Sequence, residues 1–226
     1  MPLLLDQSGL VLVAGCLALG AGLAAGGPPW LTAGERLVVG TTISVVALTG
    51  LGYLLALLLG TTVVVVLLLA AVGLAVGALL MARHLARIRA EFRPGSWWLF
   101  ATVLILAAGM AYLFTRAVEV TPDAWLSHYN NTWSDWSFHA SYATTFVYGH
   151  NLPPMNPLFS GTPFRYPFAP DFASALLIAG GFGIPAALIW PSWAMTVLAL
   201  GGLILWGRRL TGGIGAGVIE RARPNR

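Results

Sequence analysis

The sequence predicts an all-α fold, a polytopic transmembrane helix bundle of about six membrane segments with one large loop outside the lipid. Hydrophobic residues make up 58% of the 226 residues and charged residues only 9%, a composition typical of a polytopic membrane protein. Apolar runs of spanning length recur along the chain. One polar, aromatic-rich segment, 116–171, interrupts them and holds three of the four histidines. We expect any chemistry to reside there, on an outer-face loop.

Four apolar runs precede this loop. A hydrocarbon core about 30 Å thick requires about 20 residues of helix. Applied to the region 1–115, this criterion predicts spans at Gly9–Gly26, Leu37–Leu59, Thr61–Met81 and Trp97–Thr115. The tight connection at residues 60–62 makes the second and third spans antiparallel neighbours. Gly73 and Gly77 in the third span would let helices approach closely, although glycine is common in membrane helices for other reasons.

The arginines predict the orientation. Residues 83–93 hold four arginines and one glutamate, and cytoplasmic loops carry such an excess of positive charge. Loop 83–95 should therefore be cytoplasmic, and alternation puts loop 116–171 outside. We expect an integral protein of a bacterial cytoplasmic membrane. The chain has no lysine, and its arginines lie mainly in short loops and the tail, which indicates topology and lipid headgroups as their role and no nucleic-acid partner.

Two further membrane segments are predicted in the region 172–210, at Phe172–Trp190 and Pro191–Gly207. Each is near the short end of a spanning helix. If both cross the membrane, Arg208 and Arg209 come outside, against the charge rule. Either one segment is re-entrant or the fold overrides the rule. The glycine-rich tail 211–226 is predicted to be disordered.

The first half of the loop predicts a surface helix over residues 133–148. Thr132 and Asp135 have the spacing of a capping box, and glycine and proline follow from residue 149. At 100° per residue, one stripe collects Asp135, His139, Tyr142, Phe146 and, if the helix persists, His150. The adjacent stripe, which begins at Trp136, is apolar. Such a helix should lie along the membrane surface with this apolar side down.

Asp135 and His139 stand at positions i and i+4 and could share a proton, a metal ion or a phosphate-bearing substrate. A structural explanation is also open: Asp135 completes the helix cap and complements the helix dipole, and His139 sits at the interface. A metal site is the weaker reading, because two ligands do not make a coordination sphere.

The second half of the loop, 151–167, is rich in proline and aromatic residues, which predicts an ordered extended segment. Arg165 is the only cation there. It could grip a phosphate group bidentately, form a structural pair with Asp171, or bind a lipid headgroup. Asp171 follows Pro170 and opens an apolar helix, so we expect it to be a helix cap.

Together these features resemble the first outer-face loop and following helices of the GT-C class of polytopic glycosyltransferases, which includes the protein mannosyltransferases and the lipid A aminoarabinose transferase. Members have an acidic residue at the start of a surface helix, proline-containing turns, an aromatic–proline segment opening the next span, and a Gly-Arg-Arg-Leu type helix end. The matching elements here are Asp135, Leu152-Pro153-Pro154, Ser160-Gly161-Thr162-Pro163, Tyr166-Pro167-Phe168 and Gly207-Arg208-Arg209-Leu210-Thr211-Gly212.

This resemblance implies transfer of a sugar from a polyprenyl-phosphate donor to an acceptor on the outer face, with inversion at the anomeric carbon. Asp135 would be the general base or a ligand of a divalent metal such as Mg²⁺ or Mn²⁺. His139 would orient Asp135 or contact phosphate, and on chemical grounds Arg165 would stabilise the leaving phosphate. The remaining candidate substrate-binding residues are Tyr142, Tyr166 and His150.

Two departures from the family pattern bear on these expectations. Ser134-Asp135 stands where members usually have paired acidic residues, which leaves metal dependence open. Members also have many more spans after this region. We therefore expect the chain to be an amino-terminal portion of a transferase or one half of a split one, with membrane lipid and a second polypeptide as partners. The alternative is a non-catalytic scaffold or transporter subunit that binds lipid or a partner through loop 116–171.

Overall fold

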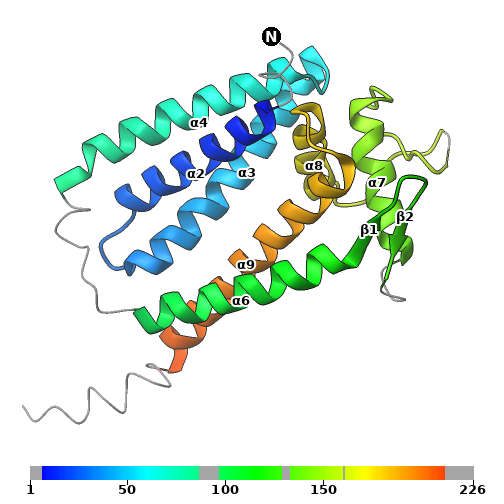
Figure 1. Cartoon of the computed structure of the whole chain (residues 1–226). Helices are drawn as coiled ribbons and strands as arrows, with labels where there is room; N and C mark the ends of the chain where they lie inside the picture. Colours follow the sequence, from blue (N-terminus) through cyan, green and yellow to red (C-terminus); the bar gives the residue numbers. More distant parts are fainter. Residues whose placement is uncertain (1–6, 87–96, 129–132, 160, 212–226) are drawn as a thin grey trace, which may run out of the picture.

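The computed structural model describes residues 7–86, 97–128, 133–159 and 161–211 (Figure 1). Within these residues the chain is an all-α bundle with one short β-hairpin, which confirms the predicted fold class. The helices are α2 (Ser8–Gly26), α3 (Ala33–Leu59), α4 (Val63–Arg83), α6 (Trp97–Ala117), α7 (Trp133–Val147), α8 (Ala169–Ala179) and α9 (Ile184–Thr211). Strands β1 (Val118–Val120) and β2 (Trp125–Ser127) pair antiparallel between α6 and α7, and this hairpin was not predicted.

Four of these helices, α2, α3, α4 and α9, are long and apolar enough to cross a membrane. Helix α6 has 21 residues and runs alongside α9. In such helices the backbone satisfies its own hydrogen bonds, as the lipid interior requires. Their length and composition identify an integral membrane protein.

The predicted boundary between the last two segments, at Trp190–Pro191, is wrong. Helix α8 ends at Ala179, the chain turns through Gly180–Gly183 with Gly181 at φ 91°, and α9 continues without a break past Pro191 to Thr211. The glycine pair is the stronger break because Gly181 has a left-handed backbone, whereas a membrane helix tolerates an internal proline. With 11 residues, α8 is only about 16 Å long, too short to span. This geometry fits the re-entrant alternative.

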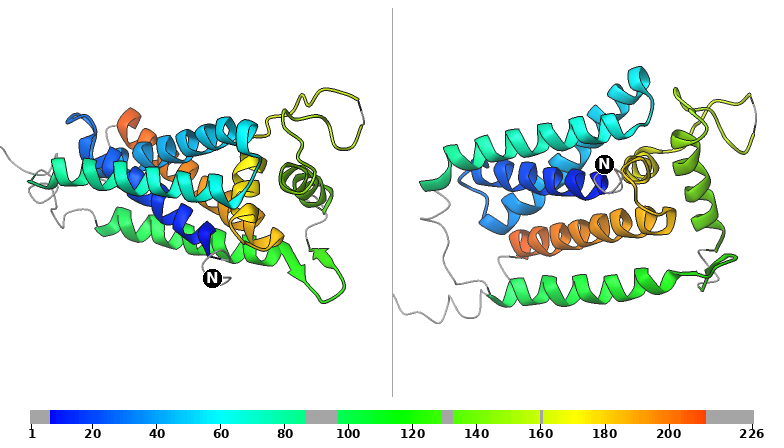
Figure 2. Two further views of the ribbon diagram at one scale, coloured as in Figure 1. Left: turned by 90° about the horizontal axis from the view of Figure 1, so that it is seen from above. Right: turned by 45° about the horizontal axis from the view of Figure 1, so that its top comes forward.

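The basic residues at the helix ends gather at one end of the bundle. The α2–α3 connection and the α9 terminus lie side by side there, and the chain ends of α4 and α6 point the same way (Figures 1 and 2). Arg209 joins the first two: its Nε lies 2.8 Å from Glu35 Oε1, and its Nη2 donates to the Trp30 carbonyl at 2.6 Å. Because α8 does not cross, Arg208 and Arg209 come to the same end as Arg36, and the conflict with the charge rule disappears.

Glycines bring α2 and α4 together. Helices α3 and α4 are neighbours through the tight hairpin, but α4 packs mainly along α2. A Cβ placed on Gly73 would lie 2.6 Å from the Gly15 carbonyl oxygen, and one on Gly77 would overlap the Ala18 carbonyl. The close approach that Gly73 and Gly77 could allow is therefore realised, with α2 as the partner.

Replacing Gly77 by leucine should lower the free energy of unfolding by about 3 kcal/mol or more, because backbone of α2 and α4 must separate to admit the side chain. Thermal unfolding of the purified chain in detergent measures this. Gly50→Leu is the matched control, since a Cβ at Gly50 meets no atom within 4 Å. An equal loss of stability in both variants would contradict the packing role.

Helix α7 crosses the end of the bundle opposite these basic residues (Figure 2, right). Its bounds match the predicted 133–148, while the proposed cap at Thr132 lies outside the described residues. The helix docks on α8: Ala143 and Phe146 are buried, and the Phe146 ring meets Phe172 edge-on at 5.3 Å. Packing against α8 therefore fixes the position of the polar stripe of α7.

Candidate functional site

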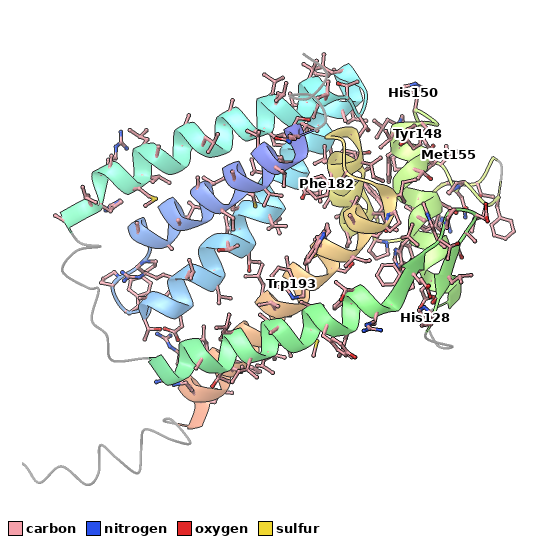
Figure 3. All side chains as sticks on the ribbon, in the orientation of Figure 1. His128, Tyr148, His150, Met155, Phe182 and Trp193 are labelled. Carbon is pink, nitrogen blue, oxygen red and sulfur yellow. The ribbon has the colours of Figure 1, made fainter. Side chains whose placement is uncertain are left out.

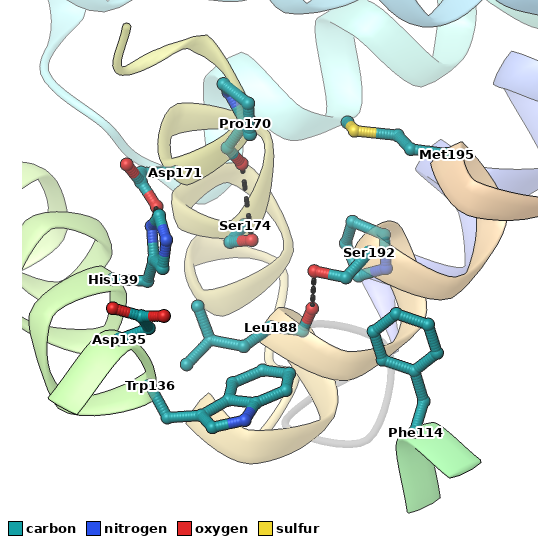
Figure 4. Close-up of a pocket in the computed structure, with 11 residues that line it drawn as sticks. Phe114, Asp135, Trp136, His139, Pro170, Asp171, Ser174, Leu188, Ser192 and Met195 are labelled. Atoms are coloured by element: carbon teal, nitrogen blue, oxygen red, sulfur yellow. Dashed lines mark hydrogen bonds and ion pairs between the residues drawn. The ribbon is translucent and has the colours of Figure 1, made fainter. Parts of the chain in front are cut away.

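A cavity of about 290 Å³ lies where α7, α8, α9 and the end of α6 meet (Figure 4). Its two walls differ in chemistry. The wall from α7 and α8 carries the polar side chains Asp135, His139, Asp171 and Ser174. The wall from α6 and α9 carries Phe114, Leu188, Pro191, Ser192 and Met195 and is mainly apolar. Its volume is at the lower end of the range of small-molecule sites.

His139 and Asp171 join α7 to α8 across the polar wall. His139 Nδ1 lies 2.7 Å from Asp171 Oδ1, and the side chains are 35% and 3% exposed, respectively (Figure 4). Donation from Nδ1 to the carboxylate leaves Nε2 for a ligand. Asp171 was expected to cap α8, and this is wrong: it sits in the first turn, the helix has no side-chain cap bond, and its carboxylate binds His139.

The second carboxylate oxygen of Asp171 is buried and has no hydrogen-bond partner among the described residues. Burying a carboxylate with half of its acceptors unused is unfavourable for folding. Unsatisfied buried groups of this kind are rare in native proteins and call for a specific explanation, such as a role in binding or catalysis.

His139 is the ionisable cation of the cavity. The hydrogen bond that His139 donates to Asp171 raises the pKa of His139 above its ordinary 6.5, partial burial opposes this, and the negative charges of Asp171 and Asp135 add to it. The imidazole therefore keeps its proton to higher pH than a free histidine does. A positive charge next to an apolar wall suits an anionic group attached to a lipid.

Asp135 stands one turn before His139 on α7 and is exposed at the cavity. Its position in the first turn also complements the helix dipole. The cap explanation depends on Thr132, outside the described residues. Asp135 and His139 thus line one cavity, as their spacing predicted, and Asp171 joins them from α8.

The predicted aromatic residues Tyr142 and Tyr166 hold the loop in place outside this cavity. Tyr142 is buried, with its ring 4.1 Å from Phe138 and 4.5 Å from Phe164, both roughly perpendicular. The Tyr166 ring is partly exposed and lies 6.1 Å from the imidazole of His139. These aromatic contacts pack segment 161–168 against α7.

Two other candidates lie apart from the site. Arg165 is exposed, does not line the cavity, and makes no ion pair with Asp171 or with any other carboxylate of the described chain. His150 lies beyond the end of α7 with φ at 49° and is exposed (Figure 3). The helix stops at Val147, so the stripe that would have included His150 does not continue.

In the described ranges, no three or more histidine, cysteine, aspartate or glutamate side chains are placed to hold a metal ion. A metal at Asp135 therefore remains a prediction.

The sequence alone missed Asp171 and the apolar wall. Asp171 carries a readable signal, since it is an acidic residue directly between Pro170 and Phe172. Phe114 and Met195 carry none, because only the packing of α6 against α9 brings them to the cavity. No family model, curated protein or solved structure matches the chain.

Proposed function

We propose that the chain is a membrane glycosyltransferase, or a portion of one, that transfers a sugar from a polyprenyl-phosphate donor to an acceptor on the outer face. One observation carries the proposal: Asp135, His139 and Asp171 line a cavity whose opposite wall is mainly apolar and comes largely from α9, which is long and apolar enough to cross a membrane. A lipid-linked sugar has this same division into a polar head and an apolar tail. The family resemblance of the loop adds the reaction type.

The proposed reaction gives one role to each of Asp135, His139 and Asp171. Asp135 accepts the proton of the acceptor hydroxyl, whose oxygen then bonds to the anomeric carbon. The bond from that carbon to the phosphate oxygen breaks, and its electron pair leaves with the polyprenyl phosphate. Protonated His139 stabilises the leaving phosphate through Nε2. Asp171 is a positioning residue that fixes the imidazole and favours its protonated form.

The charge pattern supports an outer location for this cavity. In the sequence, Arg83 ends α4, Arg87, Arg89 and Arg93 follow it in the connection to α6, and Arg208 and Arg209 lie in the last turn of α9. Positive charge of this density favours the cytoplasm, so the cavity end faces outward.

A membrane-impermeant maleimide tests the sidedness. In a Cys16→Ala background, a cysteine at exposed Tyr148 should react in intact cells, and one at Arg208 only after permeabilisation. The reverse pattern would refute the assignment. The labelling does not depend on enzymatic activity.

The function is tested by donor turnover. The purified chain is placed in liposomes with mannosyl or aminoarabinosyl polyprenyl phosphate, the donors of the families it resembles, with and without added Mg²⁺ or Mn²⁺. We expect release of polyprenyl phosphate together with glycosylated acceptor. A folded preparation that releases neither, from either donor and under every metal condition, would overturn the proposal for this chain.

An exposed apolar tip favours the second candidate function, a scaffold that binds a partner through loop 116–171. Met155, Leu158 and Phe159 are 43%, 50% and 67% exposed, respectively. Asn151 and Asn156 brace this tip by hydrogen bonds to its backbone. If the chain is only a scaffold, substitutions at Asp135 should have no measurable effect. If it is a transferase, they should abolish turnover.

A further inference from the structure

Helix α6 turns one face away from the rest of the described bundle. At 100° per residue, Ile105, Gly109, Tyr112 and Arg116 form one line along it. The opposite face meets α9, where Trp193 Nε1 donates to the Ala107 carbonyl at 2.8 Å (Figure 3). In both views of Figure 2, α6 lies at the edge of the bundle.

This outward line, which we call the α6 stripe, is apolar up to Tyr112, has a gap at Gly109 and ends at Arg116. Ile105 and Tyr112 are 71% and 62% exposed. A Cβ placed on Gly109 would meet no atom within 4 Å, so the glycine leaves a gap between the two larger side chains. From Ile105 to Arg116 the helix rises about 16 Å, close to half of a hydrocarbon core about 30 Å thick. The stripe therefore matches the depth of one leaflet.

A second hollow of about 710 Å³ lies at the loop end of the stripe, where α6 passes into the β-hairpin. Its polar lining comes from Tyr112, Thr115, Arg116, Glu119 and His128. The Arg116 guanidinium lies over the Tyr112 ring, 5.4 Å from its centroid. Glu119 also lines this hollow, but its Oε2 lies 2.8 Å from His128 Nε2.

Within the described residues Arg116 forms no ion pair, although Glu119 lines the same hollow. In the part of the chain that the structure describes, no carboxylate lies within ion-pair distance of its guanidinium. Arginine binds phosphate oxygens bidentately, and tyrosine is favoured at the headgroup level of a membrane. A cation above an aromatic ring and a leaflet-deep apolar stripe together match an anionic amphiphile.

We propose that Arg116 and the hollow beside it bind the phosphate group of an anionic membrane phospholipid, whose acyl chain lies along the α6 stripe. The site is separate from the cavity at Asp135, because Phe114, on the opposite face of α6, lines that cavity. Lipid bound here would cover the outward face of α6 independently of any sugar transfer.

Native mass spectrometry and thermal unfolding of the full purified chain test the site, with phosphatidylglycerol as the probe and phosphatidylcholine as the neutral comparison. We expect Arg116→Gln to weaken phosphatidylglycerol binding about tenfold, the loss of one charge-assisted contact. Arg116→Lys should restore part of it. Arg165→Gln removes the same charge from the exposed loop and should leave binding unchanged. Gly109→Leu fills the notch and should weaken binding of both lipids.

Three results would overturn the proposal. One is equal phosphatidylglycerol binding by the wild-type chain and Arg116→Gln. Another is full stabilisation by millimolar inorganic phosphate, which would make this a site for free anions. The third is a dimer that Gly109→Leu dissociates, which would show that a second copy covers the stripe.

Discussion

Replacing Asp135 by asparagine is expected to abolish sugar transfer while the fold stays intact. Asparagine has nearly the same shape, but its amide cannot take the proton of the acceptor hydroxyl. A positioned general base contributes about 10²- to 10⁴-fold to rate, so turnover should fall by at least about a hundredfold. Asp135 is exposed at the cavity, and its loss removes one dipole contact at the start of α7, which affects stability by less than about 1 kcal/mol.

Donor binding and turnover must be measured separately for this variant. Asp135→Asn should keep its affinity for the lipid-linked donor, because His139 and the apolar wall remain, and lose the release of polyprenyl phosphate. Asp123→Asn is the matched control, an exposed carboxylate in the turn between β1 and β2 that lies outside the cavity. Unchanged turnover in Asp135→Asn, in a preparation that is active as wild type, would rule out the catalytic assignment.

The sequence predicts the long helices well because their signal is local. Helices α2 and α4 fall within two residues of the predicted spans, since a run of apolar residues is sufficient to define a membrane segment. The start of α3 was placed four residues late, at Leu37. Glu35 and Arg36 look like loop residues, but Thr32 and Glu35 form a capping box, and Arg209 neutralises Glu35.

Only half of the site could be predicted, because the sequence reveals residues that are brought together locally, within one helix. Asp135 and His139 share one helix, so spacing along the sequence brings them together. Asp171 is 32 residues from His139 and reaches it only because α7 docks on α8. A phosphate-binding role was predicted for Arg165 from its charge alone. The aromatic contacts that hold the loop leave its side chain outside the cavity.

Replacing Asp171 by asparagine should move the pH dependence of turnover. The amide oxygen can still accept the Nδ1 proton of His139, so the ring stays in place, but the negative charge that raises the pKa of His139 is gone. The pKa of the imidazole should fall toward its ordinary 6.5. The fold should tolerate the change, because the buried position without a partner then holds a neutral amide NH2 group in place of half of a charged carboxylate.

The direction of the shift in the pH profile follows because the protonated imidazole of His139 is the active form. A raised pKa means that the imidazolium is fully present below the ordinary value and is lost as pH rises through the higher value of the folded protein. Wild-type turnover should therefore decline only above that higher value, and the decline in Asp171→Asn should begin at lower pH. At a pH above the pKa of His139 in both proteins, turnover in Asp171→Asn should be lower than in wild type by about tenfold for each pH unit by which that pKa has fallen. Acidification should restore it. Glu119→Asn is the control, because it breaks the exposed pair with His128 on the hairpin and should not move the profile. A uniform loss of turnover at every pH in Asp171→Asn would mean that Asp171 is purely structural and that the charge of His139 plays no part in the reaction.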